Sequence, residues 1–345
     1  MRLLENLQNG EKVTDWNTLG SDWNEQETIV AIGKILTEWG LPSNSQIKLI
    51  SLSENAVFLV ENPQVNKKLA LRVHFQGYNT PIEIDSELTW LSAIISETDL
   101  KTVKPVPTQK GTLRRTLADG RSVVAFEYID GIPLKSSTDM RITMEELGAI
   151  TAKLHVHSMK WCPPKGFQRK IWDFQNCVGQ NAIFGDWRNS VGLSNDGYRM
   201  IANAVSVLER RLQSWGVDDN HFGLIHGDLK SANLLIGSDG PILLDFDDCG
   251  FGWFLYDFGC AATDLKVEDI DKCASNWAKG YRSVSPLSDL EEKMLPTFVL
   301  LRRIMTMAWA GSHRFSPVAM QDYGVDYTET SLEFISNLLT SDVII

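Results

Sequence analysis

The sequence contains few cysteines, and their arrangement excludes two common ways of stabilising a fold. Five are present in 345 residues, an odd number, and no two form a Cys-x-x-Cys pair. We therefore expect neither a disulfide framework nor a cysteine-based zinc site, and this cysteine usage fits a reducing compartment. The five are Cys162, Cys177, Cys249, Cys260 and Cys273.

Long apolar runs are also missing. The first residues turn polar after a few positions, without the apolar stretch of a secretory signal. The most apolar stretch near the other end, 294–310, is too short to span a bilayer and contains Arg302 and Arg303. The sequence therefore predicts a cytoplasmic protein that does not insert into a membrane.

A surplus of basic residues is absent as well, because the net charge is −11. Nucleic acid is not expected as the main partner, since phosphate backbones bind basic surfaces. The acidic balance suits a cationic substrate, and it equally serves solubility alone. With 43% hydrophobic and 22% charged residues, the chain has the composition of a globular protein. Its length favours two lobes of one unit.

Hydrophobic periodicity divides the chain into a strand-rich first part and a helical second part. Alternation predicts strands at 47–52, 55–60, 68–75, 112–117 and 121–129, and the helical period predicts helices at 24–39 and 82–97. Beyond them, helices are predicted at 143–160, 194–214, 264–281, 288–311 and 327–340, with one hairpin around 237–240. We expect an α+β protein with a small antiparallel-sheet lobe, 1–130, and a larger mainly helical lobe, 131–345. Residues 1–23 lack periodicity and are interpreted as a loose arm.

The segment 224–248 carries most of the chemical information in the sequence. Asp228 and Asn233 flank a short loop, and two apolar strands joined by a tight turn then lead to Asp245. Two hydrogen-bonded strands would place Asn233 beside Asp245, with Asp228 close by. Phosphoryl transfer from a nucleotide needs two oxygen ligands for Mg²⁺ and a separate carboxylate that orients the attacking hydroxyl. The segment therefore indicates a kinase.

This segment resembles the protein-kinase-like superfamily, specifically its aminoglycoside phosphotransferase and choline kinase branch. The family pattern, His-Gly-Asp followed by Asn, is met by His226-Gly227-Asp228 and Asn233. The resemblance runs from about residue 45 to the last helices, and it implies a bilobal kinase-like fold. It also implies that Asp228 is the catalytic base, that Asn233 and Asp245 bind Mg²⁺, and that His226 is structural.

Three residues near the motif receive further roles from the resemblance. Asp247, at a position where the branch is commonly acidic, is expected to contact a second metal or the substrate. Asp257 matches an aspartate that hydrogen-bonds the catalytic loop, although it also suits a helix cap. Lys230 matches the lysine with which protein Ser/Thr kinases neutralise the γ-phosphate, and the alternative is an exposed surface lysine.

The resemblance places the nucleotide against the first sheet. Leu69-Ala70-Leu71-Arg72 stands where the superfamily has Val-Ala-Ile-Lys, and strand alternation puts Ala70 and Arg72 on one face. Ala70 would then contact the adenine, and the Arg72 guanidinium would bind the α- and β-phosphates. Glu87 on the following helix is the expected ion-pair partner of Arg72, with Glu83 as its competitor.

Two nucleotide-binding elements depart from a regular pattern. The phosphate-covering loop corresponds to Ser53-Glu54-Asn55, which contains no glycine, so Ser53 and Asn55 are the expected donors to phosphate. The segment 123–129 resembles the hinge strand, and the main-chain atoms of Glu127 and Ile129 are expected to contact the adenine.

The acceptor is expected to be a small molecule. The segment between Asp245 and Tyr256-Asp257 is too short for a peptide platform, and no Ala-Pro-Glu motif is present. Indole rings beside carboxylates suit an amine-bearing acceptor, arginines suit a carboxylate, and tryptophans also serve as core residues. The candidate pocket residues are Trp172, Asp173, Asp186, Trp187, Asp247, Arg302, Arg303 and Trp309.

The predicted activity is Mg²⁺-dependent transfer of the γ-phosphate of ATP to a hydroxyl group of an aminoglycoside-, choline- or homoserine-like acceptor. A bacterial protein Ser/Thr kinase of the stress-response type is the alternative, supported by Lys230. A nucleotide-binding pseudokinase is the third hypothesis, and the intact Asp228, Asn233 and Asp245 oppose it. The acceptor, the choice between ATP and GTP, and the oligomeric state stay open.

Overall fold

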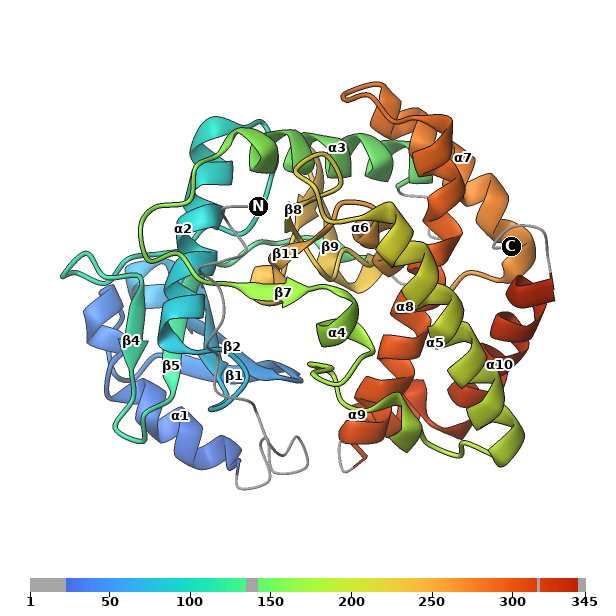
Figure 1. The fold of residues 1–345 in the computed structure, drawn as a ribbon. Helices are drawn as coiled ribbons and strands as arrows, with labels where there is room; N and C mark the ends of the chain where they lie inside the picture. Colours follow the sequence, from blue (N-terminus) through green and yellow to red (C-terminus); the bar gives the residue numbers. More distant parts are fainter. Residues whose placement is uncertain (1–22, 135–141, 315–316, 341–345) are drawn as a thin grey trace.

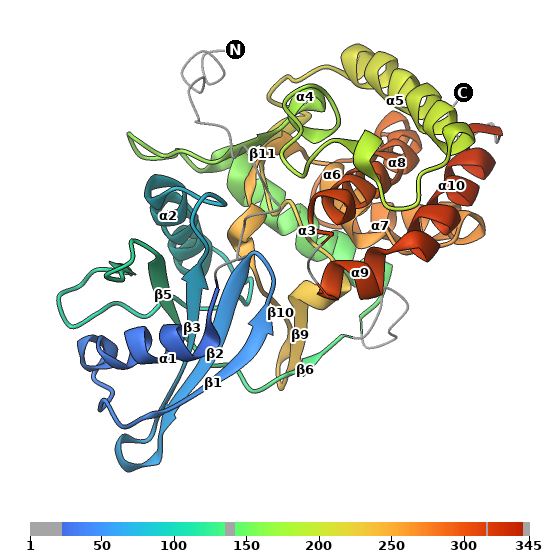
Figure 2. The same cartoon turned by 90° about the horizontal axis from the view of Figure 1, so that it is seen from below.

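The computed structural model describes residues 23–134, 142–314 and 317–340. A strand-rich part and a larger helical part lie side by side, as the sequence predicts (Figure 1). The view from below shows the sheet on one side and helices α5 to α10 on the other (Figure 2). The interpretation of 1–23 as a loose arm concerns residues that lie outside the described part, apart from Trp23.

The first part is a five-stranded antiparallel sheet with the strand order β1-β2-β3-β5-β4. Its strands are β1 (Gln46–Leu52), β2 (Asn55–Asn62), β3 (Lys67–His74), β4 (Arg114–Thr116) and β5 (Ser122–Glu127). One face buries Phe58, Leu71 and Val123. Helix α1 (Glu25–Gly33) and the short 3₁₀ helix Leu36–Trp39 pack against this face, so the helix predicted at 24–39 is interrupted.

Helix α2 (Pro81–Glu97) connects the sheet to the helical part. It begins with a capping box between Thr80 and Glu83, and Pro81 occupies the first helical position, where no hydrogen bond is lost. Its buried residues Leu88 and Trp90 belong to the same apolar core as the helices that follow. Helix α2 is therefore packed into the larger part of the molecule.

The helical part surrounds α8 (Asp289–Ser312), whose residues from Met294 to Ala308 are all buried. The other helices are α3 (Met144–Lys160), α4 (Phe174–Cys177), α5 (Asn195–Trp215), α6 (Tyr256–Ala261), α7 (Val267–Arg282), α9 (Pro317–Tyr323) and α10 (Val325–Thr340). Helices α3 and α7 touch through glycines. A Cβ on Gly148 would lie 2.0 Å from the Trp277 carbonyl oxygen, and one on Gly280 would lie 1.7 Å from that of Glu145.

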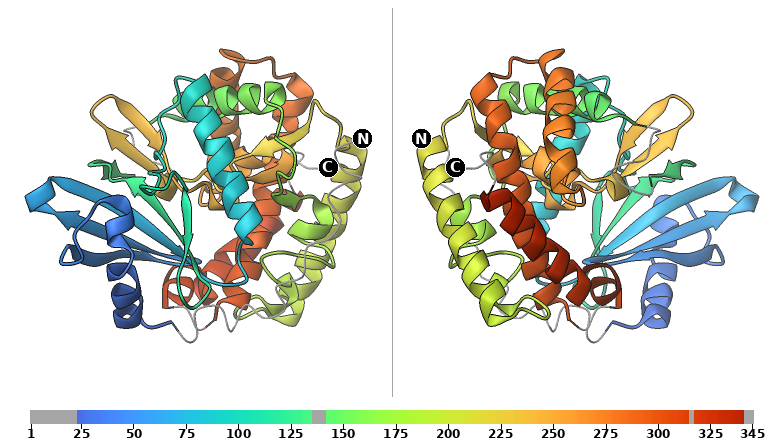
Figure 3. Two further views of the ribbon diagram at one scale, coloured as in Figure 1. Left: turned by 90° about the vertical axis from the view of Figure 1, so that its left-hand side faces the viewer. Right: turned by 90° about the vertical axis from the view of Figure 1, so that its right-hand side faces the viewer.

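The helical part contains more strands than the sequence predicts. The expected hairpin, β9 (Leu234–Gly237) and β10 (Gly240–Leu243), pairs with β6 (Ile132–Pro133) and projects to the same side as the large sheet (Figure 3). A further sheet, not predicted, joins β7 (Lys170–Trp172), β11 (Gly250–Trp253) and β8 (Phe222–Ile225). The prediction of a single hairpin in this half was wrong, because strands of three or four residues are too short to show alternation.

Candidate active site

The loop after β8 is held in place by hydrogen bonds to the Asp257 side chain of α6. The two carboxylate oxygens of Asp257 accept hydrogen bonds from the backbone N–H groups of His226, at 3.1 Å, and Gly227, at 2.8 Å. The imidazole of His155 lies 3.1 Å from the same carboxylate, and His226 Nε2 lies 2.9 Å from the Leu244 carbonyl oxygen. Asp257 and His226 thus have the contacts of supporting residues rather than of reacting groups.

Gly227 is the residue that allows this loop to approach the segment after β10. Its φ angle is 81°, in the left-handed region, and a Cβ there would lie 2.4 Å from the Asp248 carbonyl oxygen. Only glycine fits both conditions, which explains the residue between His226 and Asp228 in physical terms.

Asp228 is buried and contacts three nitrogen-bearing side chains. Arg302 of α8 donates to its Oδ1 at 2.5 Å, Asn233 Nδ2 donates to its Oδ2 at 2.7 Å, and Lys230 lies 3.1 Å from Oδ2. Burial alone would raise the pKa of Asp228, but the charges of Lys230 and Arg302 outweigh it and leave this pKa below its ordinary value. Asp228 is therefore an oriented, ionised carboxylate.

Asn233 and Asp245 come together as the strand pairing requires. Leu243 is paired with Leu234, and the backbone N–H of Leu244 donates to the Asn233 carbonyl at 2.9 Å. Because Asn233 uses its amide NH₂ on Asp228, its side-chain oxygen is left for another ligand. Asp245 has a φ angle of 53°, which is unusual for a residue with a Cβ and is typical of functional sites.

The charge around Asp245 suits a divalent cation. Burial is the largest cause and the negative charges of Asp247 and Asp228 add to it, so the pKa of Asp245 is raised to about 8. Since 46% of its side chain is exposed, we attribute this shift more to the neighbouring carboxylates than to burial. Carboxylate and amide oxygens are the donors that Mg²⁺ prefers. Within the described ranges, no cluster of three His, Cys, Asp or Glu side chains forms a metal site by itself, so phosphate oxygens would have to complete this one.

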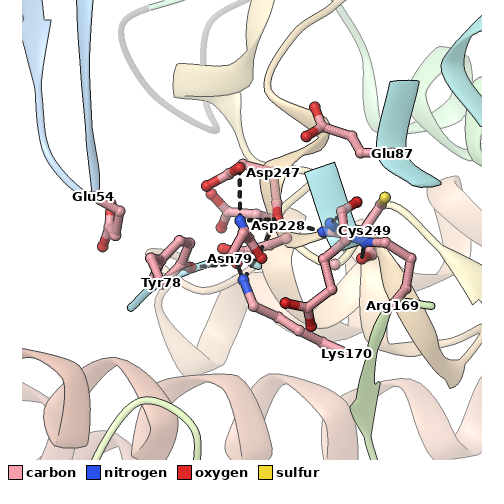
Figure 4. Close-up of polar contacts among 12 residues, drawn as sticks. Glu54, Tyr78, Asn79, Glu87, Arg169, Lys170, Asp228, Asp247 and Cys249 are labelled. Carbon is pink, nitrogen blue, oxygen red and sulfur yellow. Dashed lines mark hydrogen bonds and ion pairs between the residues drawn. The ribbon is translucent and has the colours of Figure 1, made fainter. Parts of the chain in front are cut away.

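Asp247 is the centre of a buried polar network. Its Oδ2 accepts from Asn55 Nδ2 and its Oδ1 from Asn79 Nδ2, both at 2.8 Å (Figure 4). His74 Nδ1 lies 3.6 Å from Oδ1. Burial would raise the pKa of Asp247, but Arg72, His74 and nearby charges outweigh it and lower this pKa. Both oxygens of this predicted metal or substrate ligand are therefore engaged by protein amides.

Residues that the sequence did not single out complete this network. Arg169 donates to the carbonyl oxygens of Asp247, at 2.5 Å, and Cys249, at 2.6 Å, and Lys170 lies 3.0 Å from the Asp248 carboxylate. The Tyr78 hydroxyl also donates to the Asp248 carboxylate. The loop between β3 and α2 is thereby attached to the segment after Asp245. The only local signal was the pair of adjacent basic residues at 169–170, which by itself is unspecific.

Arg72 pairs with Glu87 and not with Glu83. Arg72 Nη2 lies 2.7 Å and 2.8 Å from the two Glu87 oxygens, whereas Glu83 closes the capping box of α2. Arg72 Nε also lies 3.3 Å from His74 Nε2, which must accept, because a guanidinium only donates. Burial and the charge of Arg72 lower the pKa of His74 to about 3. The guanidinium is thus fixed at the edge of the site, with Asp245 3.6 Å from Nη1.

The remaining predicted nucleotide contacts are constrained by backbone bonds. The Ser53 N–H donates to the Asn55 carbonyl, and the Asn55 amide donates to Asp247, so these two donors are used within the protein. The Glu127 N–H donates to the Lys104 carbonyl at 2.9 Å. Adenine contacts at the hinge would therefore involve the Glu127 carbonyl and the backbone of Ile129.

Most of the tryptophans and one arginine proposed for the acceptor pocket are core residues. Trp172 and Trp187 are 0% and 1% exposed. Trp172 Nε1 donates to the Asp248 carbonyl at 2.8 Å, while Arg303 lies over the Phe334 ring and donates to a backbone carbonyl. These three side chains therefore lie in the core, which for the two tryptophans is the alternative that the sequence left open. Asp173 and Asp186 cap short helices.

Trp309 of α8 differs from the other candidates because it is partly exposed and contacts the sheet part. Its Nε1 donates to Glu54 in the turn between β1 and β2, at 2.6 Å. Tyr323 of α9 packs edge-on against it at 5.7 Å between ring centres. Tyr323 also lies near enough to Lys230 for each to affect the pKa of the other. An aromatic wall thus extends from Asp228 and Lys230 towards Glu54.

The comparisons with known proteins agree with this arrangement. The structure of a microcompartment-associated aminopropanol kinase is 36% identical, with a TM-score of 0.83, and the match covers 92% of this chain and 99% of that one. The amicoumacin kinase of Bacillus subtilis is 22% identical over 76% of this chain and 79% of its own length. A homoserine kinase of Gluconobacter oxydans is 27% identical over 61% of this chain and 66% of its own.

Fold and comparisons together define a kinase that phosphorylates a hydroxyl group of a small molecule. The chain belongs to the phosphotransferase enzyme family, whose model matches residues 46–294. This family favours a small-molecule kinase over the protein kinase alternative, and so does the short path from Asp245 to α6. In the part of the chain that the structure describes, no helix is long and apolar enough to cross a membrane.

Proposed function

We propose that the protein transfers the γ-phosphate of ATP to the hydroxyl group of a small amino alcohol. The observation that carries this proposal is the pair formed by the Glu54 carboxylate and the Trp309 indole, which Tyr323 connects to Lys230. A carboxylate and an aromatic ring together attract an ammonium group. The similarity to an aminopropanol kinase over most of the chain supports the same acceptor class.

The nucleotide would lie between the sheet and the loop that carries Asp228. Ala70 and Arg72 share one face of β3, and Glu87 orients the guanidinium so that one side of its fork is left for phosphate oxygens. The hinge contributes main-chain atoms of Glu127 and Ile129. Ser53 contributes through its hydroxyl rather than through its N–H, which the turn already uses.

Asn233 and Asp245 are the residues that would hold Mg²⁺. The free side-chain oxygen of Asn233 and the crowded carboxylate of Asp245 fit a hard cation that also binds phosphate. When bound, the ion would neutralise charge on the phosphates. Asp247 contributes by fixing this segment to Asn55 and Asn79, and any direct contact with a second metal would require it to exchange one of these bonds.

Asp228 would orient the acceptor hydroxyl and receive its proton. Arg302 and Asn233 fix its carboxylate, and the two nearby cations keep it ionised. Lys230 has 30% of its side chain exposed, and it lies on the side where the transferred phosphoryl group would pass. Positioning and charge neutralisation supply most of the rate in such enzymes.

A panel of acceptors tests the proposal directly. ADP release would be measured with 1-amino-2-propanol, ethanolamine, choline, homoserine, hydroxylysine and an aminoglycoside. Propane-1,2-diol is the matched control, because it keeps the C2 hydroxyl of 1-amino-2-propanol and carries a neutral hydroxyl in place of the ammonium. We expect kcat/KM for 1-amino-2-propanol to exceed that for the diol by at least about tenfold, the factor that 1.4 kcal/mol of ammonium binding provides.

Two results would contradict the acceptor class. Equal turnover of the diol and the amino alcohol would show that the ammonium is not recognised. Preference for homoserine over the simple amino alcohols would indicate a cationic site for a carboxylate instead. Glu54→Gln gives an independent check, since it should raise KM for the amino alcohol and leave KM for the diol unchanged.

A further inference from the structure

The turn between β1 and β2 is attached at both its base and its tip by side chains of the helical part. At the base, Asn55 donates to Asp247 at 2.8 Å. At the tip, Glu54 accepts from Trp309 at 2.6 Å, a contact between residues 255 positions apart in the sequence. The β1–β2 hairpin points towards the α9 end of the helical part (Figure 1), and Glu54 lies beside Tyr78 (Figure 4).

The turn contains no glycine, and these two side-chain hydrogen bonds fix its position instead. Without glycine, the backbone of Ser53, Glu54 and Asn55 has less freedom to wrap around phosphates, so side-chain contacts must set the position of the turn. Asn55 is 6% exposed, and its hydrogen bond to Asp247 belongs to the buried polar network around that aspartate. The Glu54 contact is only partly buried, so it is the one of the two that a ligand can reach from solvent.

We propose that the Glu54–Trp309 hydrogen bond couples acceptor binding to the closure of this turn over the nucleotide. This inference rests on the proposed function, because it requires the acceptor ammonium to bind beside Glu54 and Trp309. An ammonium beside the Glu54 carboxylate and over the face of the Trp309 ring adds a second attraction between the turn and α8 and leaves the hydrogen bond in place. The acceptor thereby favours the closed turn, and the closed turn favours bound nucleotide. Glu54 and Trp309 are positioning residues in this scheme.

The coupling must be reciprocal. If the acceptor raises the affinity for nucleotide by some factor, the nucleotide raises the affinity for the acceptor by the same factor. Trp309→Phe keeps an aromatic face but removes the N–H, so it should reduce the coupling while retaining most of the acceptor affinity. Glu54→Gln keeps an oxygen that accepts from the indole but removes the charge, so it should weaken acceptor binding. The two variants therefore separate the role of the Glu54–Trp309 hydrogen bond from the role of the Glu54 charge in binding the ammonium.

The experiment is calorimetry with AMP-PNP and Mg²⁺, in the presence and absence of saturating 1-amino-2-propanol. AMP-PNP does not donate its terminal group on this timescale, so equilibrium affinities are measured. For the unaltered protein we expect the acceptor to tighten AMP-PNP binding by at least about fivefold, the lower end of usual coupling factors. Trp309→Phe should bring this ratio close to one. Trp215→Phe is the matched control, since the Trp215 Nε1 has no hydrogen-bond partner and its ratio should not change.

The outcomes distinguish the inference from the function on which it rests. If the protein turns over the amino alcohol but AMP-PNP binds equally well with and without it, the coupling is overturned while the acceptor class stands. An unchanged ratio in Trp309→Phe would also overturn it, because the hydrogen bond would then carry no coupling. If no amine in the acceptor panel is turned over, both proposals are overturned.

Discussion

Arg302 and Asp228 form a buried ion pair in which Arg302 Nη2 lies 2.5 Å from the Asp228 Oδ1 oxygen. The same guanidinium donates to the Tyr256 hydroxyl at 3.0 Å, so it is itself fixed by α6. The contact connects the longest helix of the described structure to the proposed catalytic base. If Asp228 acts as proposed, α8 positions the base directly, which the motif around Asp228 does not reveal.

Substitution of Asp228 tests the base itself. Asp228→Asn should lower kcat by about 10²- to 10⁴-fold, the usual contribution of a general base, while AMP-PNP affinity stays within a few fold. Steady-state kinetics and calorimetry measure the two quantities. Near-normal kcat in this variant would show that Asp228 does not take the proton.

Arg302→Met should affect both the rate and its pH dependence. Loss of the anchor displaces Asp228, and a displacement of 1 Å costs about 10²-fold in kcat. Arg302 contributes to the lowered pKa of Asp228, so the carboxylate of the variant becomes protonated at a higher pH. Activity, which is lost as pH falls through this pKa, should therefore be lost at a higher pH than in the unaltered protein. Arg302→Lys should restore part of the rate, and an unshifted acid limb would contradict the assigned charge effect.

The metal site is tested by contrasting two aspartates in the same segment. Asp245→Asn should raise the Mg²⁺ concentration needed for half-maximal activity by at least about tenfold, because it removes a carboxylate ligand. Asp247→Asn should instead lower stability, since Asn55 and Asn79 would lose their charged acceptor. Mg²⁺ titrations and urea unfolding separate these effects. A Mg²⁺ requirement that changes more in Asp247→Asn would make Asp247 the principal ligand.

The Arg72–Glu87 pair should contribute to both stability and nucleotide binding. Breaking a buried ion pair on one side costs about 3–5 kcal/mol, and these side chains are 6% and 1% exposed. Glu87→Gln should therefore lower the free energy of unfolding by an amount in this range and raise KM for ATP. Glu83→Gln, on the same helix, is the control: glutamine also completes a capping box, so both stability and KM for ATP should change little.

Gly227→Ala should be far more damaging than the same change at another left-handed glycine. At Gly227 the added Cβ would lie 2.4 Å from the Asp248 carbonyl oxygen, whereas at Gly40, with φ 71° and ψ 23°, it would lie 3.6 Å from Lys67 Nζ, an ordinary contact. The left-handed conformation alone costs about 1–2 kcal/mol. Gly40→Ala should lose roughly that amount of unfolding free energy with normal activity. Gly227→Ala should lose more and should also lose activity, and equal stabilities would contradict the close approach.

Local patterns in the sequence were enough to predict the main elements of the fold and the strand pairing beside Asn233 and Asp245. The helix predicted at 288–311 is α8, and the capping box at Thr143 and Glu146 begins α3 as expected. The strand pairing that brings Asn233 to Asp245 follows from the tight turn between two apolar runs. These features depend on contacts between residues close in the chain, which a sequence pattern encodes directly.

Other features depend on contacts between distant segments, and the sequence alone could not predict them. Arg169 reaches the carbonyl oxygen of Asp247, 78 positions away, and Arg302 reaches Asp228, 74 positions away. No local pattern distinguishes these arginines from Arg303, which packs in the core. The choice between Glu87 and Glu83 likewise depended on the crossing of α2 over β3, and the exposed Trp309 was not distinguishable from the buried Trp172.

The membership of α2 in the larger apolar core has a consequence for how the molecule opens. Leu88 and Trp90 pack with residues of the helical part, while the outer face of the sheet has a separate core around Phe58. The core that holds α2 also includes Val124 and Phe126 of β5, so any opening of the sheet away from the helical part would have to move the strands across α2. Arg72 of β3 and Glu87 of α2 face each other across the contact between strand and helix. Such a movement would therefore change the distance between the two charged groups. Cutting the chain near residue 130 should for the same reason yield two insoluble fragments instead of two folded ones.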